Sequence, residues 1–126
     1  MKNTRTVCIA LLALFMSVPS FAQKGKVLFI LSEADTLLLK KGKKKRQTGV
    51  FLNEFYLAHK AIADAGFAID YATPTGKKST IDQESLDDDY WEGKLELKPE
   101  AIDFWENNQS FSNPMTLTKA IEKQSE

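Results

Sequence analysis

Cysteine and histidine are almost absent from this sequence of 126 residues, which contains one of each. The cysteine, Cys8, lies in an apolar amino-terminal segment that we expect to be removed, so the remaining chain would have no disulfide and no thiol nucleophile. The histidine, His59, has no second imidazole or thiolate with which to share a metal ion, and we interpret it as a partly exposed structural residue. Glycine-rich phosphate loops, nucleophile-elbow motifs and zinc-binding helix motifs are also missing. We therefore predict no cofactor and no metal.

The sequence also has no excess of positive charge, because it contains 17 basic and 17 acidic residues. Removal of Lys2 and Arg5 with the leader would leave 15 basic against those 17 acidic residues, so nucleic acid is not an expected partner. The basic run from Lys40 to Arg46 is expected to be a solvated loop, and an anion-binding or membrane-surface patch is the alternative.

The amino-terminal residues have the features of an export signal. Two positive charges in Met1–Arg5 precede the apolar stretch Thr6–Val18, and Ser20-Phe21-Ala22 offers small residues at the −3 and −1 positions of a cleavage site. The apolar stretch is too short to span a membrane. We predict a signal peptide over residues 1–22 and an exported domain over residues 23–126, periplasmic or secreted and free of the membrane after cleavage. An uncleaved anchor and a hydrophobic first strand are the alternatives.

The next residues predict a β-α-β unit. Lys26–Leu31 is a continuous apolar run, which is typical of a strand buried on both faces of a parallel sheet. Thr48 is a candidate N-cap of a helix that ends at Gly66, and Phe67–Ala72 is a second strand, closed by the turn residues 73–76. Two strands separated by one helix predict parallel pairing with a right-handed crossover, as in doubly wound α/β folds.

The second half of the chain has weaker periodicity. We expect a long covering loop over Lys77–Asn113 that contains short helical turns, above all near Glu100–Asn107, and a last short helix over Pro114–Lys123. Two parallel strands that are apolar on both faces need more strands and helices than this inventory supplies. The fold class is therefore α/β, an incomplete parallel-sheet domain.

One carboxylate lies among apolar residues on the predicted helix. Glu54 falls within an arc formed by Val50, Phe51, Leu57, Ala58, Ala61, Ile62 and Ala65, with Asn53, Tyr56, Lys60 and Asp64 opposite. A carboxylate on a buried face either finds hydrogen-bond donors or takes up a proton, and it then suits general acid chemistry. The alternative is a glutamate that reaches the edge of the arc or meets a lysine.

Four segments together resemble the ThiJ/PfpI family, in its glyoxalase III and heat-shock chaperone branch. They are Lys26–Leu31, Thr48-Gly-Val-Phe-Leu-Asn-Glu-Phe55, Asp64-Ala-Gly-Phe-Ala-Ile-Asp-Tyr-Ala-Thr-Pro-Thr-Gly76 and Ile81-Asp-Gln-Glu-Ser85. The resemblance covers roughly residues 26–113, and the combination is more specific than any one segment.

This resemblance implies a flavodoxin-like sheet and a site made of a helix glutamate, a cysteine on a strand-to-helix elbow and a following histidine. Glu54 matches the glutamate, and we expect it to be the catalytic residue that this chain supplies. The family's later Gly-Gly-His-Gly loop and Cys-His elbow have no counterpart, His59 does not match the family histidine, and Ala58 stands where the family often has proline.

Three interpretations follow. The first is a truncated exported ThiJ/PfpI-like protein whose full-length relatives resemble cysteine-dependent glyoxalase III, converting methylglyoxal to lactate, or hydrolase and chaperone enzymes. Such a chain would be inactive alone, would meet an α-oxoaldehyde only when completed, and would form a homodimer or associate with the missing carboxyl-terminal part. The second is a non-catalytic exported binding or interaction module, and the third is an unrelated small α/β protein.

Overall fold

A parallel sheet lies at the centre of the part of the chain that the structure describes. The computed structural model describes residues 24–40 and 44–124, so the predicted export segment with Cys8 lies outside it. Strand β1 (Lys26–Ile30) pairs in parallel with β4 (Ala68–Thr73), which pairs in parallel with the two-residue strand β5 (Met115–Thr116). The parallel pairing of the first two strands confirms the prediction, whereas β5 was not predicted.

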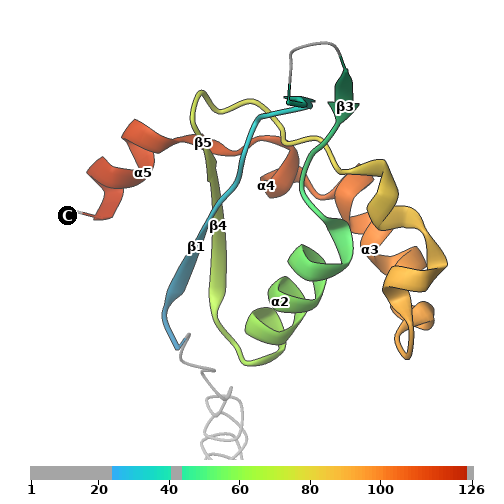
Figure 1. Cartoon of the computed structure of the whole chain (residues 1–126). Coiled ribbons are helices and arrows are strands. Elements are labelled where there is room, and N and C mark those ends of the chain that lie inside the picture. The colour runs from blue at the N-terminus through green and yellow to red at the C-terminus, as the bar shows by residue number, and fades with distance from the viewer. Residues whose placement is uncertain (1–23, 41–43, 125–126) are drawn as a thin grey trace, which may run out of the picture.

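Helices cover both sides of this sheet (Figure 1). Helix α2 (Leu52–Asp64) connects β1 to β4 and lies on one side together with α3 (Lys98–Asn107), while α5 (Leu117–Gln124) lies on the other side. This is the two-sided cover that a parallel sheet requires. The architecture is the predicted α/β, flavodoxin-like fold.

Helix α2 ends as the sequence predicts but begins later. Gly66, at a φ of 86°, donates its N–H to the Ala63 carbonyl, and Phe67 donates to Ile62, so the helix closes with a Schellman motif. The prediction that Thr48 caps the helix is wrong, because the N-cap position is Phe51 and no side chain caps it. Residues 48–50 are instead extended, since Val50 forms a parallel bridge with Ile81.

The basic run Lys40–Arg46, expected to be a solvated loop, lies partly outside the described residues, and its last residues belong to a hairpin. Strands β2 (Thr36–Leu38) and β3 (Lys45–Gln47) pair antiparallel, and all of their residues are exposed. No apolar alternation marks such short exposed strands, which is why the sequence pattern did not predict them.

The segment after β4 contains the expected short helical turns, which follow one another along the chain. Three 3-10 helices, two further helices and strand β5 follow one another, and the predicted helix near Glu100–Asn107 is confirmed inside α3. Pro114 lies outside the last helix, because Met115 and Thr116 join the sheet before α5 starts. The bounds of the remaining short elements are η1 Gln83–Leu86, η2 Asp88–Trp91, η3 Leu95–Leu97 and α4 Gln109–Ser112.

Large aromatic side chains form the core between the sheet and helices α2, α3 and α4. Trp91 and Phe111 are each only 1% exposed, and the Trp91 indole donates to the Ser85 carbonyl at 2.9 Å. Trp91 and Phe111, from the segment of weak periodicity, therefore share one core with residues of α2 and β4, whereas Tyr90 is 43% exposed. The buried core residues are Leu52, Phe55, Tyr56, Tyr71, Ile81, Trp91, Ala101 and Phe111.

Gly49 allows two backbone segments to meet. A Cβ atom at this position would lie 2.5 Å from both the Thr80 carbonyl oxygen and the Ile81 carbonyl carbon. Real Cβ atoms do not approach backbone this closely, so a side chain here would push the segment before α2 away from residues 80–82. Gly49 is required because any side chain would clash with the backbone of Thr80 and Ile81, and not because of a special backbone conformation.

We predict that Gly49→Ala lowers the free energy of unfolding by about 3 kcal/mol, because the overpacked backbone must move. Gly66→Ala is the matched control, since its added Cβ meets nothing within 4 Å and only the positive φ is penalised, a cost of about 1 kcal/mol. Urea unfolding of both variants measures the difference. Equal losses would contradict the steric role of Gly49.

Candidate functional site

The carboxyl ends of β1 and β4 point to the same edge of the sheet, where open α/β sheets bind ligands. Helix α2 returns the chain from this edge to the start of β4, so its first turn, with Glu54, lies on the carboxyl side. The loop after β1, the turn after β4 and the start of α2 therefore surround the candidate site.

Glu54 is exposed in the first turn of α2. Its backbone N–H donates to the Asn53 side-chain oxygen at 2.7 Å, and its carboxylate has no hydrogen bond or ion pair within the described residues. A negative charge in a first turn interacts favourably with the helix dipole. The expectation that Glu54 lies on the buried face of the helix is wrong.

The buried face of α2 lies on its other side. Leu52, Phe55 and Tyr56 are buried, whereas Ala58 and Ala61 beside Glu54 are exposed. Three of the seven residues in the predicted apolar arc are alanines, which bury little area, and the arc left out all three buried residues of the helix. Tyr56, placed opposite the arc, therefore turned out to be in the core.

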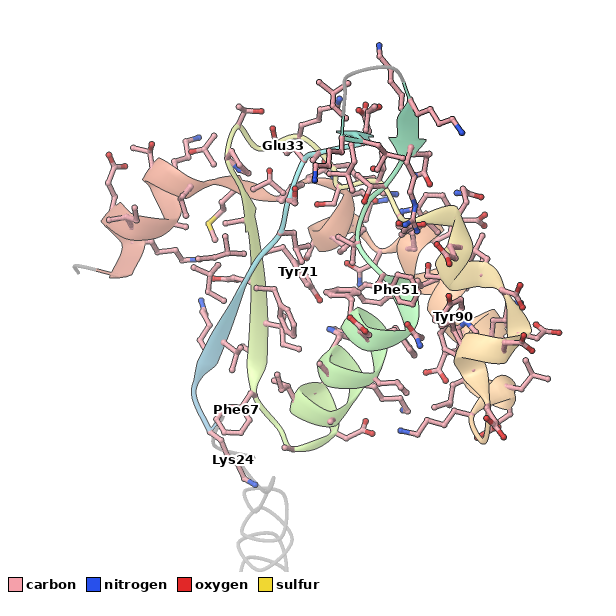
Figure 2. The ribbon with its side chains drawn as sticks, in the orientation of Figure 1. Lys24, Glu33, Phe51, Phe67, Tyr71 and Tyr90 are labelled. Carbon is pink, nitrogen blue, oxygen red and sulfur yellow. The ribbon has the colours of Figure 1, made fainter. Side chains whose placement is uncertain are left out.

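Glu33 joins the loops that follow β1 and β4 (Figure 2). Its carboxylate accepts the Thr75 backbone N–H at 2.6 Å, the Thr75 hydroxyl at 2.9 Å and the Lys77 backbone N–H at 3.2 Å. The Thr75 backbone N–H is the largest cause that lowers the pKa of Glu33 to about 2, against a smaller opposing effect of desolvation. Glu33 was not predicted as a site residue, because a single acidic residue in a loop gives no sequence pattern.

Residues 75–82 form a strap that hydrogen-bonds to both neighbouring segments. The Ser79 hydroxyl donates to the Ser32 carbonyl at 2.8 Å, and the Thr80 carbonyl accepts the Val50 N–H at 2.8 Å. The Gln47 side chain adds a 2.8 Å bond to the Ile81 carbonyl. The first turn of α2 is thereby held at a fixed distance from the ends of both long strands.

Phe51 and Tyr90 form an aromatic contact beside the start of α2. Their rings meet edge to face at 4.9 Å, and the Asn53 amide donates to the Tyr90 carbonyl at 2.7 Å (Figure 2). The Tyr90 hydroxyl donates to Glu84, which raises the pKa of Tyr90. These contacts dock the segment 83–91 against the residues next to Glu54.

His59 is buried in part among aromatic rings. Its Nδ1 atom lies 2.8 Å from the Tyr71 hydroxyl, and its ring lies 4.4 Å from that of Phe104. Burial lowers the pKa of His59, with Lys60 acting in the same direction and Asp64 opposing it. The described residues contain no group of three His, Cys, Asp or Glu side chains that could hold a metal ion.

Comparison with solved structures finds glyoxalase III from Candida albicans. The match has a TM-score of 0.54 and 24% sequence identity, and it covers 77% of this chain and 38% of that protein. At this identity the likeness shows a common fold, and this chain spans well under half of the length of that protein. No family model matches the sequence, and no curated protein matches it.

The lowered pKa of His59 predicts that the protein loses stability as pH falls below about 6.5. The unfolded chain then takes up a proton that the folded chain resists, and no other histidine is present to contribute. His59→Phe should flatten the dependence of Tm on pH between 5.5 and 7.5.

Tyr71→Phe is the control for this experiment. It removes the hydrogen bond to His59, at a cost of about 1 kcal/mol, but keeps the titrating ring. The pH dependence of Tm should persist in Tyr71→Phe. A dependence that also persists in His59→Phe would show that another group is responsible.

Proposed function

We propose that this chain is the amino-terminal portion of an exported ThiJ/PfpI-like protein, and that it contributes Glu54 to a cysteine-dependent glyoxalase III type of site. The observation that carries the proposal is the likeness to a glyoxalase III over 77% of the chain. The segments Thr48–Phe55 and Asp64–Gly76, on which the resemblance to that family rests, form the start of α2 and the end of α2 with β4. Both segments therefore belong to the β-α-β unit of this fold.

The chemistry of such a site explains why Glu54 is exposed here. In the proposed reaction a thiolate adds to the aldehyde carbon of an α-oxoaldehyde, and the hemithioacetal rearranges before hydrolysis to the hydroxy acid. The only cysteine of this chain is Cys8, before the first strand. The thiol must then come from a further segment, which would meet the unpartnered Glu54 carboxylate from the solvent side of α2.

We predict that residues 24–123, grafted in place of the matching segment of the Candida albicans glyoxalase III, give a chimera that converts methylglyoxal to lactate. Glu54→Ala in this chimera should lower kcat by about 100-fold or more, the range for loss of a group that handles a proton. Lactate release measured at saturating methylglyoxal gives the comparison.

Glu96→Ala is the matched control, because Glu96 is also an exposed glutamate in a first helical turn. It should leave kcat unchanged. Thermal melting of each variant separates loss of turnover from loss of fold. A Glu54→Ala chimera with full turnover would remove Glu54 from the site, and the isolated chain turning over methylglyoxal would overturn the dependence on an added thiol.

Export is the second part of the proposal. We predict that expression with the native leader in a two-membrane bacterium yields a periplasmic product whose amino terminus is Gln23, because Ala22 is the small residue expected at the −1 position. Intact-mass spectrometry of the periplasmic fraction measures the terminus, and Ala22→Arg should block cleavage. A cytoplasmic product that retains Met1 would contradict export.

Among the residues that the structure describes, no helix combines the length and the apolar character of a membrane span.

A non-catalytic exported binding module is the second candidate function. It is favoured by large apolar side chains on the surface, since Leu38 is 70% exposed, Ile121 63% and Ile30 61%. Such residues are typical of interaction surfaces when they lie close together. A sharp two-state melt of the isolated chain would favour this candidate, whereas a broad transition with binding of a hydrophobic dye would favour an incomplete domain.

A further inference from the structure

The β2–β3 hairpin projects from the rest of the fold (Figure 1). It follows the loop after β1, leads back to the extended residues before α2, and lies beyond the carboxyl edge of the sheet. All of its strand residues are exposed, so neither of its faces is covered by the sheet or the helices. Its surface is therefore open to a binding partner.

Three consecutive leucines of this hairpin are exposed. Leu37 is 46% exposed, Leu38 70% and Leu39 42%, which is the longest run of exposed large apolar side chains among the described residues. Successive strand residues point to opposite faces, so Leu38 shares a face with Lys45, its partner in the register. Single exposed leucines are common on protein surfaces, whereas a contiguous exposed group marks an interaction surface.

The cations beside these leucines have no partner within the described residues. The side chains of Lys40, Lys44 and Lys45 are exposed and make no hydrogen bond or ion pair there. Arg46 differs, because it binds Glu84 and lies 3.9 Å from Asp82 at the base of the hairpin. The sequence has no acidic residue over positions 36–47, so the outer end of the hairpin has positive charge only.

Exposed leucines next to free lysines have the chemistry that binds an anionic lipid surface. Such a surface attracts lysine side chains, and leucine side chains gain free energy when they leave water for the acyl boundary. Lysine stems can lie in the same apolar layer while their ammonium groups reach the phosphates. A soluble polyanion would bind the lysines but leave the leucines in water, so the leucines favour lipid as the partner.

We propose that the β2–β3 hairpin is a peripheral docking site for anionic lipid bilayers. Leu38 and Leu39 enter the headgroup boundary, and the lysines around them contact lipid phosphates without any segment spanning the bilayer. The expectation of a solvated loop, free of the membrane, considered the basic run and the acidic residues that balance it, but not the leucines before the run. The docking requires neither the catalytic role of Glu54 nor a further segment of the chain.

Co-sedimentation with lipid vesicles measures the docking. The protein is expressed with its own leader, purified, and mixed with vesicles of phosphatidylglycerol and phosphatidylcholine or of phosphatidylcholine alone. Any leader residues that remain are the same in all variants, so differences between variants report on the hairpin. We expect tighter binding to the anionic vesicles, and a loss of at least about fivefold between about 0.1 M and about 1 M NaCl, because salt screens the lysines.

The double variant Lys44→Glu with Lys45→Glu should weaken binding to the anionic vesicles at least about tenfold, because each cation near such a surface contributes about fivefold. Lys94→Glu with Lys119→Glu is the matched control, since both of these lysines are exposed on other elements and the net charge changes equally. The control should change binding by less than about twofold, because charges far from the contact are screened.

Leu38→Ser tests whether the leucines enter the lipid. It should weaken vesicle binding at least about fivefold and leave binding to dextran sulfate, a soluble polyanion, unchanged. Ile121→Ser is its control, because Ile121 of α5 is 63% exposed, and it should change neither. On addition of anionic vesicles, the fluorescence of Leu38→Trp should shift to shorter wavelength, and that of Ile121→Trp should not.

The proposal is overturned if the wild-type protein binds anionic vesicles no better than neutral ones. It is also overturned if the Lys44 and Lys45 reversal binds as well as its control while circular dichroism shows both folded. Equal vesicle binding by Leu38→Ser and Ile121→Ser would reveal a bare cationic patch and overturn lipid insertion. Where a hairpin variant unfolds, the Leu38→Trp fluorescence decides, since the absence of a shift overturns the proposal.

Discussion

The parallel pairing of β1 with β4 is the interaction on which the rest of the structure depends. Both strands place apolar side chains on both faces of the sheet, with Lys26 and Asp70 as charged exceptions on one face, so each face needs a layer of cover. Helices α2 and α3 cover one face and α5 covers part of the other. The short helices pack on the side of α2 and α3, and strand β5 extends the sheet beside β4.

The aromatic core shows how a segment without regular periodicity becomes fixed. Phe55 of α2 lies 5.2 Å from Phe111 and 5.3 Å from Phe29 of β1, measured between ring centroids. Edge-to-face and tilted rings fill space from several directions, so they do not need the repeating spacing of a helix or strand. The segment 83–111 thus folds against the sheet through individual side chains, and its backbone forms short 3-10 helices followed by the 10-residue helix α3.

How much of the fold the sequence predicted differs from one region to another. Gly66 and the turn 73–76 have local chemistry that is independent of tertiary contacts, and both were predicted correctly. Thr48 looked like a helix cap, but its neighbour Val50 pairs with Ile81, a contact between residues 31 positions apart that no local pattern reveals. Strand β5 and the β2–β3 hairpin are too short to show a period. Glu54 became a candidate from its place in the predicted apolar arc and then from the family resemblance, while the arc counted exposed alanines as if they were core residues.

Two carboxylates near the carboxyl edge of the sheet differ in what they can do. Glu33 accepts hydrogen bonds from Thr75 and Lys77, which lower its pKa to about 2, so it stays ionised and acts as a structural link between two loops. A group held in this way cannot exchange a proton near neutral pH without breaking those bonds. Glu54 makes no such bonds within the described residues, and the helix around it is anchored by Gly49 and the strap. A rigid support with a free carboxylate is what a site needs when its other half arrives from a further segment, and this is the physical reason for assigning the proposed chemistry to Glu54 and not to Glu33.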